Sequence, residues 1–199
     1  MLSLNEINGM RIELIKKGKR HPRFAQLKYK VPPNEEAKAK YCDVDDVENS
    51  GAIGECDVAA IMSLMKKYQP KTIIEIGTWF GTSAMVMDKA CSGSAEIYTC
   101  DKNNVYVYDS KRVHYYNNGS GNFLSKMKKA GVVADFAFVD GLIVEDVKKL
   151  LRRMSKEGVI FLHDYKKPLK GYRNGAALLS EKPKSKIVKV GKDTALWVP

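Results

Sequence analysis

The segment 71–83, KTIIEIGTWFGTS, constrains the fold of this chain most, because an apolar strand leads directly into two glycines and a helix. Glycines at such a strand-to-helix corner allow positive φ angles and let a ligand approach the backbone closely. Gly77 and Gly81 lie four residues apart, which differs from the Gly-x-Gly-x-x-Gly spacing that holds a pyrophosphate. Glu75 in this corner would repel a phosphate and favours a ligand with a positively charged group. The alternative is a tight turn without a ligand, which any α/β protein can have.

Hydrophobic periodicity predicts that strands and helices alternate along the rest of the chain. The predicted strands are 72–76, 95–100, 113–116, 135–139 and 158–162, and the predicted helices are 54–68, 83–90, 123–130 and 144–154. Residues 186–190 and 194–198 are predicted to form a hairpin, and residues 4–18 a short amphipathic helix. Such alternation is typical of a mostly parallel sheet with helices on both faces.

The predicted fold class is therefore α/β, with a Rossmann-like, mostly parallel seven-stranded sheet and a C-terminal antiparallel hairpin. A chain of 199 residues is long enough for one domain with a substantial core and short for two. We expect residues 51–199 to form this domain and residues 1–50 to be a basic N-terminal cap or extension of it.

The formal net charge of +11 favours anionic partners without identifying one. Basic residues gather in 11–30 and 166–192, where they could bind nucleic acid or an anionic small molecule, or could be only a solvated surface. No apolar run approaches the roughly 20 residues that span a bilayer, and no basic start precedes an apolar core, so we expect a cytoplasmic protein without a membrane partner. The four cysteines show no Cys-x-x-Cys spacing, which argues against a zinc or redox site.

Polar residues follow the predicted strands at the end where parallel sheets bind their ligands. Asp101 comes about 20 residues after the glycine corner, where a carboxylate can accept hydrogen bonds from both hydroxyl groups of a ribose. It therefore indicates a nucleoside ligand, although an aspartate that only caps a helix or forms a turn is the alternative. The residues at these strand ends are Glu75 and Gly77, Asp101, Asp140 and Gly141, and His163 and Asp164.

From residue 52 to residue 199 the chain resembles the class I S-adenosylmethionine-dependent methyltransferases, and most closely small O-methyltransferases of the catechol and cephalosporin-hydroxylase-like types. The resemblance rests on four motifs in the same order: EIGTWFGTS at 75–83, IYTCD at 97–101, FVDG at 138–141 and GVIFLHD at 158–164. It implies a Rossmann-like methyltransferase fold, the cofactor S-adenosylmethionine and a methyltransferase activity. Residues 1–50 carry no motif of this family.

The resemblance also implies roles for the matched positions. The glycine corner would line the methionine end of the cofactor, Asp101 would bind the ribose, and Ser120 would flank the adenine. The residues expected to contact the cofactor are Glu75, Gly77, Thr78, Gly81, Ser83, Asp101, Gly119, Ser120 and Asp140.

In metal-dependent members of this family, carboxylates after the fourth and fifth strands hold a divalent cation that also binds the acceptor hydroxyl. Asp140 and Asp164 match those positions, and His163 stands where several such enzymes have an acidic residue. A cation such as Mg²⁺ would lower the pKa of the hydroxyl and orient it. Many relatives have a histidine shortly after the Asp-Gly pair, where this chain has Leu142 and Ile143. A metal-free reaction with His163 or Asp164 as general base is therefore the alternative.

The leading hypothesis is an enzyme that transfers a methyl group from S-adenosylmethionine to an oxygen of a small molecule or saccharide, and the basic segments favour an anionic acceptor. RNA as the acceptor is the second hypothesis, although residues 140–143 read DGLI and lack the Asn/Asp-Pro-Pro-aromatic motif of amine methyltransferases. A non-catalytic nucleoside-binding module of the same fold is the third. The sequence identifies neither the acceptor nor the oligomeric state, and it is compatible with a homodimer.

Overall fold

The computed structural model describes residues 53, 55–79, 81–91, 93–103, 108, 110–191 and 193–199. The expected N-terminal cap at 1–50 and the helix expected at 4–18 lie outside these residues.

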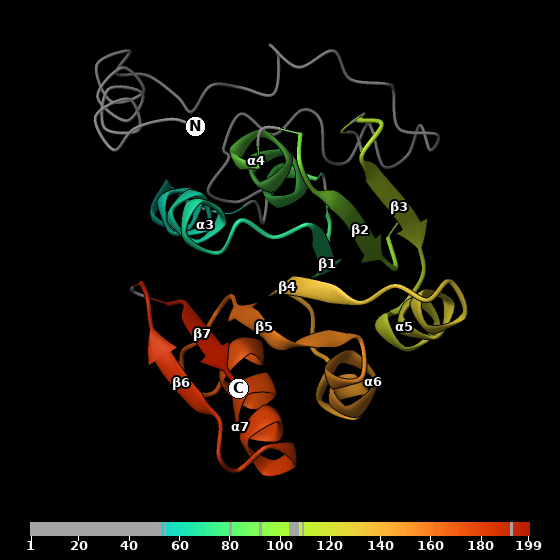
Figure 1. The fold of residues 1–199 in the computed structure, drawn as a ribbon. Helices are drawn as coiled ribbons and strands as arrows, with labels where there is room; N and C mark the ends of the chain where they lie inside the picture. The colour runs from blue at the N-terminus through green and yellow to red at the C-terminus, as the bar shows by residue number, and fades with distance from the viewer. Residues whose placement is uncertain are drawn as a thin grey trace.

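A seven-stranded sheet forms the centre of the fold, with the strand order β3-β2-β1-β4-β5-β7-β6 (Figure 1). Its parallel strands are β1 (Thr72–Ile76), β2 (Glu96–Asp101), β3 (Val113–Asn117), β4 (Ala134–Val139) and β5 (Met154–Leu162). The hairpin consists of β6 (Lys186–Lys189) and β7 (Ala195–Val198), and β7 also pairs antiparallel with β5. The predicted fold class is confirmed, including the number of strands and the C-terminal hairpin.

Helices cover both faces of this sheet (Figure 1). The layer on one face consists of α3 (Glu55–Tyr68) and α4 (Thr82–Ala90), and the layer on the other consists of α5 (Ser120–Lys129), α6 (Val147–Leu151) and α7 (Lys170–Glu181). Ile61 of α3 and Met87 of α4 belong to one buried cluster, whereas Phe123, Leu150 and Leu178 belong to the other. None of the described helices is long and apolar enough to cross a membrane.

The parallel strands in the middle of the sheet end at the same level. Ile76 of β1 pairs with Cys100 of β2 and with Val139 of β4, and Val139 pairs in turn with Leu162 of β5. The next residues in each segment therefore lie side by side at one edge of the sheet. This is the edge to which the sequence brings its polar residues.

The helix after β4 is shorter than the one predicted at 144–154. The structure has a 3-10 turn, η3 (Val144–Asp146), followed by α6, which ends at Leu151. The chain leaves the helix here because the Arg153 carbonyl accepts a hydrogen bond from the Ala134 N–H at 2.6 Å and β5 begins at the next residue. The sequence pattern could not show this boundary, because the apolar periodicity continues from the helix into the strand without a break.

The sequence pattern does not predict α7. Gly171 and Gly175 lower its helix propensity, and Leu178 is its only fully buried large apolar residue. The buried residues of α7 are Gly171, Asn174, Gly175 and Leu178, and their spacing of three and four residues is that of one helix face. That spacing is the signal from which the helix could have been predicted.

Candidate functional site

The glycine corner predicted from the sequence forms at the end of β1. Gly77 has a φ of +98°, and its N–H donates to the Cys100 carbonyl at 2.9 Å. A Cβ on Gly77 would lie 3.0 Å from the backbone of both Asp140 and Gly141, so glycine is needed where β1 meets the loop after β4. Gly81, with a φ of +92°, caps the start of α4. The corner thus joins the ends of three strands to one helix.

Glu75 lies beneath the corner and is fully buried. Its carboxyl group accepts hydrogen bonds from the hydroxyl groups of Ser83 in α4 and Thr99 in β2. Thr99 is also hydrogen-bonded to Thr78 of the corner. Burial raises the pKa of Glu75 to about 8, although both hydroxyl groups act in the opposite direction. Glu75, Thr78 and Ser83 therefore form one buried group that supports the corner from below.

Replacing Glu75 with glutamine is expected to change the pH dependence of stability. The pKa of this carboxyl group is about 8 in the folded protein, against 4.5 as its ordinary value. The stabilisation from the neutral group is therefore complete below pH 4.5 and is lost as the pH rises to about 8. Glutamine cannot ionise, so the free energy of unfolding of Glu75→Gln should gain at least about 2 kcal/mol relative to the unmodified protein over this range. Urea unfolding across that range measures the difference, and parallel pH profiles of the two proteins would contradict a buried neutral carboxyl group.

Asp101 stands at the end of β2 and holds the corner from the side. Its Oδ2 accepts the N–H of Trp79 at 3.0 Å, and its Oδ1 accepts the N–H of Asn103 at 2.8 Å. Asp101 is half-buried. A carboxylate has about four acceptor positions, so two backbone donors leave capacity for the hydroxyl groups of a ligand. The geometry is compatible with the predicted ribose contact, which stays a prediction.

Ser120 begins α5 next to the end of β3, where the adenine side of the cofactor site is predicted. Its hydroxyl donates to Asp146 Oδ2 at 2.6 Å, and Lys149 Nζ lies 2.8 Å from the other oxygen of that carboxylate. Burial would raise the pKa of Asp146, but Lys149 and Ser120 lower it overall. Ser120 therefore connects α5 to η3, and the preceding Gly119 has open space above its backbone.

Asp140, His163 and Asp164 come together after β4 and β5, as the sequence predicts. His163 Nδ1 lies 2.6 Å from Asp140 Oδ1 and 3.7 Å from Asp164 Oδ1. All three side chains are partly buried. They form the acidic part of the site beside the glycine corner, because the Asp140 N–H also donates to the Ile76 carbonyl of β1 at 2.8 Å.

Two further charged residues belong to this cluster, and the sequence analysis missed both. Asp57 of α3 has its Oδ2 3.2 Å from His163 Nε2. Lys170, the first residue of α7, has its Nζ 2.8 Å from Asp140 Oδ1 and 3.2 Å from Asp164 Oδ2. Asp57 lies 106 residues before its partner in the chain and carries no motif, so no local signal points to it. Lys170 could have been found only together with α7.

These neighbours determine the charge of the cluster. Burial would lower the pKa of His163, but hydrogen bonds to Asp140 and Asp57 and the charges of both raise it to about 10. Burial also opposes the charge of Lys170, yet Asp140 and Asp164 raise its pKa above the ordinary value. Both cations are therefore present at neutral pH and offset the charge of three carboxylates.

One face of α7 packs directly against the site. A Cβ on Gly171 would collide with the carbonyl oxygen of His163 at the end of β5. Asn174 is fully buried, and its Oδ1 accepts the N–H of Ile143 at 2.9 Å while its Nδ2 donates to the Gly141 carbonyl at 2.8 Å. This helix therefore holds both the end of β5 and the loop after β4 in place.

The cluster does not fit a divalent cation in the arrangement seen here. Asp140, His163 and Asp164 offer three ligand atoms within 4.8 Å of one another, as a metal site would. However, both ring nitrogens of His163 are hydrogen-bonded to carboxylates, and a protonated ring has no lone pair for a metal. The ammonium group of Lys170 lies against both carboxylates that the ion would use. A metal ion at the position that the family resemblance implies would have to displace it, which leaves the metal-free alternative.

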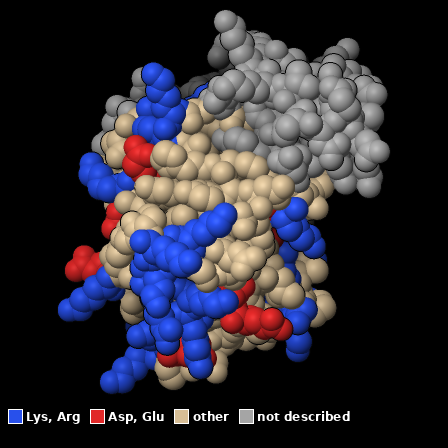
Figure 2. All heavy atoms as spheres, turned by 90° about the vertical axis from the view of Figure 1, so that its right-hand side faces the viewer, with Lys and Arg blue, Asp and Glu red and all other residues tan. Residues whose placement is uncertain are grey.

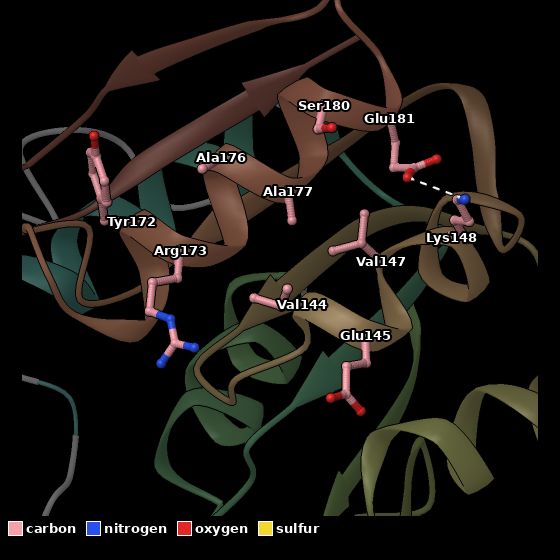
Figure 3. A pocket seen from close by; sticks show the side chains of 10 residues that line it. All are labelled: Val144, Glu145, Val147, Lys148, Tyr172, Arg173, Ala176, Ala177, Ser180 and Glu181. Carbon is pink, nitrogen blue, oxygen red and sulfur yellow. Dashed lines mark ion pairs between the residues drawn. The ribbon is translucent and has the colours of Figure 1, made fainter.

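A groove of about 610 Å³ lies between η3, α6 and the outer side of α7 (Figure 3). Its walls are largely apolar, with Val144 and Val147 on one side and small α7 residues on the other. Arg173 lies at one end, and the ion pair of Lys148 with Glu181, at 3.4 Å, lies at the other. The lining residues of α7 are on a different face from Gly171 and Asn174, so the groove is separate from the charged cluster.

Part of the chain matches a known family. Residues 74–165, from within β1 to just beyond β5, match the family model described as a methyltransferase domain. No curated protein matches the chain.

Solved structures of methyltransferases share the fold. An O-methyltransferase from Bacillus cereus in complex with SAH has a TM-score of 0.62 and 14% identity, covering 84% of this chain and 92% of that one. The O-methyltransferase TomG from Streptomyces achromogenes, involved in tomaymycin synthesis and in complex with SAM, has a TM-score of 0.62 and 13% identity, covering 100% and 99%. The SAH-bound methyltransferase PaMTH1 from Podospora anserina has a TM-score of 0.58 and 18% identity, covering 100% and 97%.

The fold and the partial family match agree on one class of protein: the chain is similar to the class I S-adenosylmethionine-dependent methyltransferases. Within this class, its fold is that of the O-methyltransferases. The resemblance inferred from the sequence is confirmed at this level.

Proposed function

We propose that the protein transfers the methyl group of S-adenosylmethionine to an oxygen atom of a small molecule or saccharide. The observation that carries this proposal is the alignment of strand ends, which brings the glycine corner, Asp101 and the cluster around Asp140 to one edge of the sheet. The Bacillus cereus and Streptomyces achromogenes proteins with the same fold are O-methyltransferases in complex with SAH and SAM, which supports both the cofactor and the reaction type.

In this proposal the cofactor lies along the edge from β4 to β3. The corner would receive the methionine end, Asp101 would accept the ribose hydroxyl groups, and the start of α5 would flank the adenine. Buried Glu75, Thr78 and Ser83 would hold the corner in shape from below. The residues proposed to touch the cofactor are Gly77, Gly81, Asp101, Gly119, Ser120 and Asp140.

Bound S-adenosylmethionine would supply a methyl group on a positively charged sulfur. The acceptor hydroxyl must lose a proton as its oxygen forms the new bond, so a general base is needed beside it. Asp164 is the candidate, because its side chain is the most exposed of the three carboxylates in the cluster, at 33%. His163 keeps its proton at neutral pH and would therefore act as a fixed positive charge next to Asp140 instead of as the base.

Replacing Asp101 with alanine is expected to weaken the binding of S-adenosylmethionine and of SAH by about a hundredfold or more. The reason is the loss of hydrogen bonds from two hydroxyl groups to a charged acceptor, each worth about 1.5–3 kcal/mol. Isothermal titration calorimetry with both ligands measures this change.

Asp135→Ala is the matched control for this experiment. Asp135 also uses its carboxylate to accept backbone N–H groups, those of Lys71 and Thr72, but it does so at the opposite end of the sheet. Its replacement should leave the affinity for SAH unchanged. Equal affinities of Asp101→Ala and the unmodified protein would contradict the ribose contact, and no binding by the unmodified protein would contradict the proposed function itself.

A basic surface favours an anionic acceptor and keeps RNA as the second candidate. Figure 2 shows Lys and Arg side chains gathered on the face that lies on the right of Figure 1, where α5 and α6 are located. The exposed basic residues of this face are Lys126, Lys128 and Lys129 of α5, Lys148 and Lys149 of α6, and Arg152 directly after α6. If RNA is the acceptor, binding of an RNA oligonucleotide should weaken steeply with increasing salt. If binding of the RNA oligonucleotide does not depend on the salt concentration, RNA is contradicted as the acceptor and the small-molecule acceptor stands.

A further inference from the structure

Lys170 occupies the place between the two carboxylates of the site. Its Nζ lies 2.8 Å from Asp140 Oδ1 and 3.2 Å from Asp164 Oδ2, so one ammonium group pairs with both. Asp140 follows β4 and Asp164 follows β5, and these are the strand ends that the metal hypothesis requires. A positive charge therefore already stands where a divalent ion would bridge the two oxygens.

The fold holds this ammonium group in position. Lys170 is the first residue of α7, and Gly171 brings that helix into contact with the carbonyl group of His163, which immediately precedes Asp164. Asn174, one turn further along, holds the loop that follows Asp140 through the Gly141 carbonyl. The lysine and both carboxylates are thus fixed to the same helix start, whereas a lysine on an unattached loop could move aside for an ion.

We propose that Lys170 is a built-in cation that positions Asp140 and Asp164 in place of a divalent metal ion. Two carboxylates this close repel each other unless a positive charge lies between them. A lysine supplies that charge permanently but offers no coordination position to an acceptor oxygen. In the proposed reaction, Lys170 therefore acts through Asp164, the candidate base, as a positioning residue. The role of Lys170 in positioning the base rests on the proposed function, whereas the exclusion of a metal ion by Lys170 does not.

The test is metal binding by variants at this position. Mn²⁺ is titrated into the unmodified protein and into Lys170→Met, which keeps an unbranched side chain one atom shorter and removes its charge, at constant pH and ionic strength. Lys170→Met should bind one Mn²⁺ about tenfold or more tighter than the unmodified protein, because two freed carboxylates suit a hard cation. Lys170→Arg, which restores a cation, should not gain this binding. Adding Asp164→Asn to Lys170→Met should abolish the gain.

Lys166→Met is the matched control, because Lys166 is an exposed lysine in the segment between β5 and α7 and its removal changes the net charge equally. It should not gain Mn²⁺ binding. Circular dichroism verifies folding of each variant, and Lys170→Gln replaces Lys170→Met if the latter does not fold. The proposal is overturned if a folded Lys170→Met or Lys170→Gln variant gains no Mn²⁺ binding. It is also overturned if the unmodified protein binds Mn²⁺ as tightly as these variants and loses it in Asp140→Asn.

The same titrations separate this proposal from the proposed function. Calorimetry with SAH on the unmodified protein reports on the cofactor site, and Mn²⁺ binding reports on the cluster. Failure of SAH to bind would remove the methyltransferase proposal and leave the metal result standing. Normal SAH binding together with tight Mn²⁺ binding by the unmodified protein would remove the proposal for Lys170 and leave the methyltransferase proposal standing.

Discussion

Replacing Gly171 with alanine is expected to lower the free energy of unfolding by about 3 kcal/mol, near the upper end of what overpacking a close contact costs. The added Cβ would collide with the His163 carbonyl oxygen and lie 2.8 Å from the backbone carbon of Asp164. These atoms are backbone atoms at the end of β5, so they cannot turn away as a flexible side chain could. Urea unfolding followed by circular dichroism measures the loss.

The direction of the change in stability of Gly171→Ala is informative. Within a helix, alanine is more favourable than glycine by about 1 kcal/mol, so without the contact the variant would be more stable. Gly119→Ala is a comparison without a steric contact, because nothing lies within 4 Å of a Cβ at that position; Gly119 is the N-cap of α5, so only the cap preference, well below the loss expected at Gly171, should change its stability. If Gly171→Ala were as stable as the unmodified protein, the packing of α7 on the end of β5 would be contradicted, and with it the position of Lys170.

Replacing Gly77 with alanine is expected to reduce both stability and cofactor affinity. The unfolding free energy should fall by about 3 kcal/mol, which combines the cost of a positive φ with a crowded contact. The Cβ would lie 3.0 Å from the backbone of Asp140 and Gly141, so it would push the loop after β4 away from the corner. Because Asp140 and the corner are both proposed to touch the cofactor, SAH affinity should fall by about tenfold or more.

Gly131→Ala separates the cost of a positive φ from the cost of the crowded contact. Gly131 has a φ of +70°, but a Cβ there would meet nothing within 4 Å. This variant should lose only the cost of the backbone conformation, about 1–2 kcal/mol, and should bind SAH normally. Equal losses of stability in the two variants, with SAH affinity retained in both, would show that the contact between Gly77 and the loop after β4 is unimportant.

The sheet and its ligand edge could be predicted from the sequence because their signals are local. Each parallel strand is a short apolar run, and each polar residue of the edge directly follows its own strand. Because neighbouring parallel strands pair side by side, their carboxyl ends then lie at the same edge of the sheet. The position of Glu75 beneath the corner could also have been deduced, because it alternates with Ile74 and Ile76 and must point to the α4 face of the sheet.

The rest of the site depends on contacts between distant parts of the chain. Asp57 reaches His163 from α3, and whether a carboxylate on a helix faces a strand end is decided by how the helix packs. Lys170 lies in a segment whose glycines suggest a loop, yet those glycines are what allow α7 to approach the sheet closely. His163 could not be assigned as base or cation from the sequence, because its charge depends on Asp140 and Asp57 together.

The order of the last described strands restricts how the sheet can be completed. β7 follows β6 in the chain but lies between β6 and β5 in the sheet, so β6 has no sheet neighbour other than β7 among the described strands. β6 therefore cannot add to the sheet by itself, and it joins only together with β7, as the outer arm of a hairpin that pairs with β5.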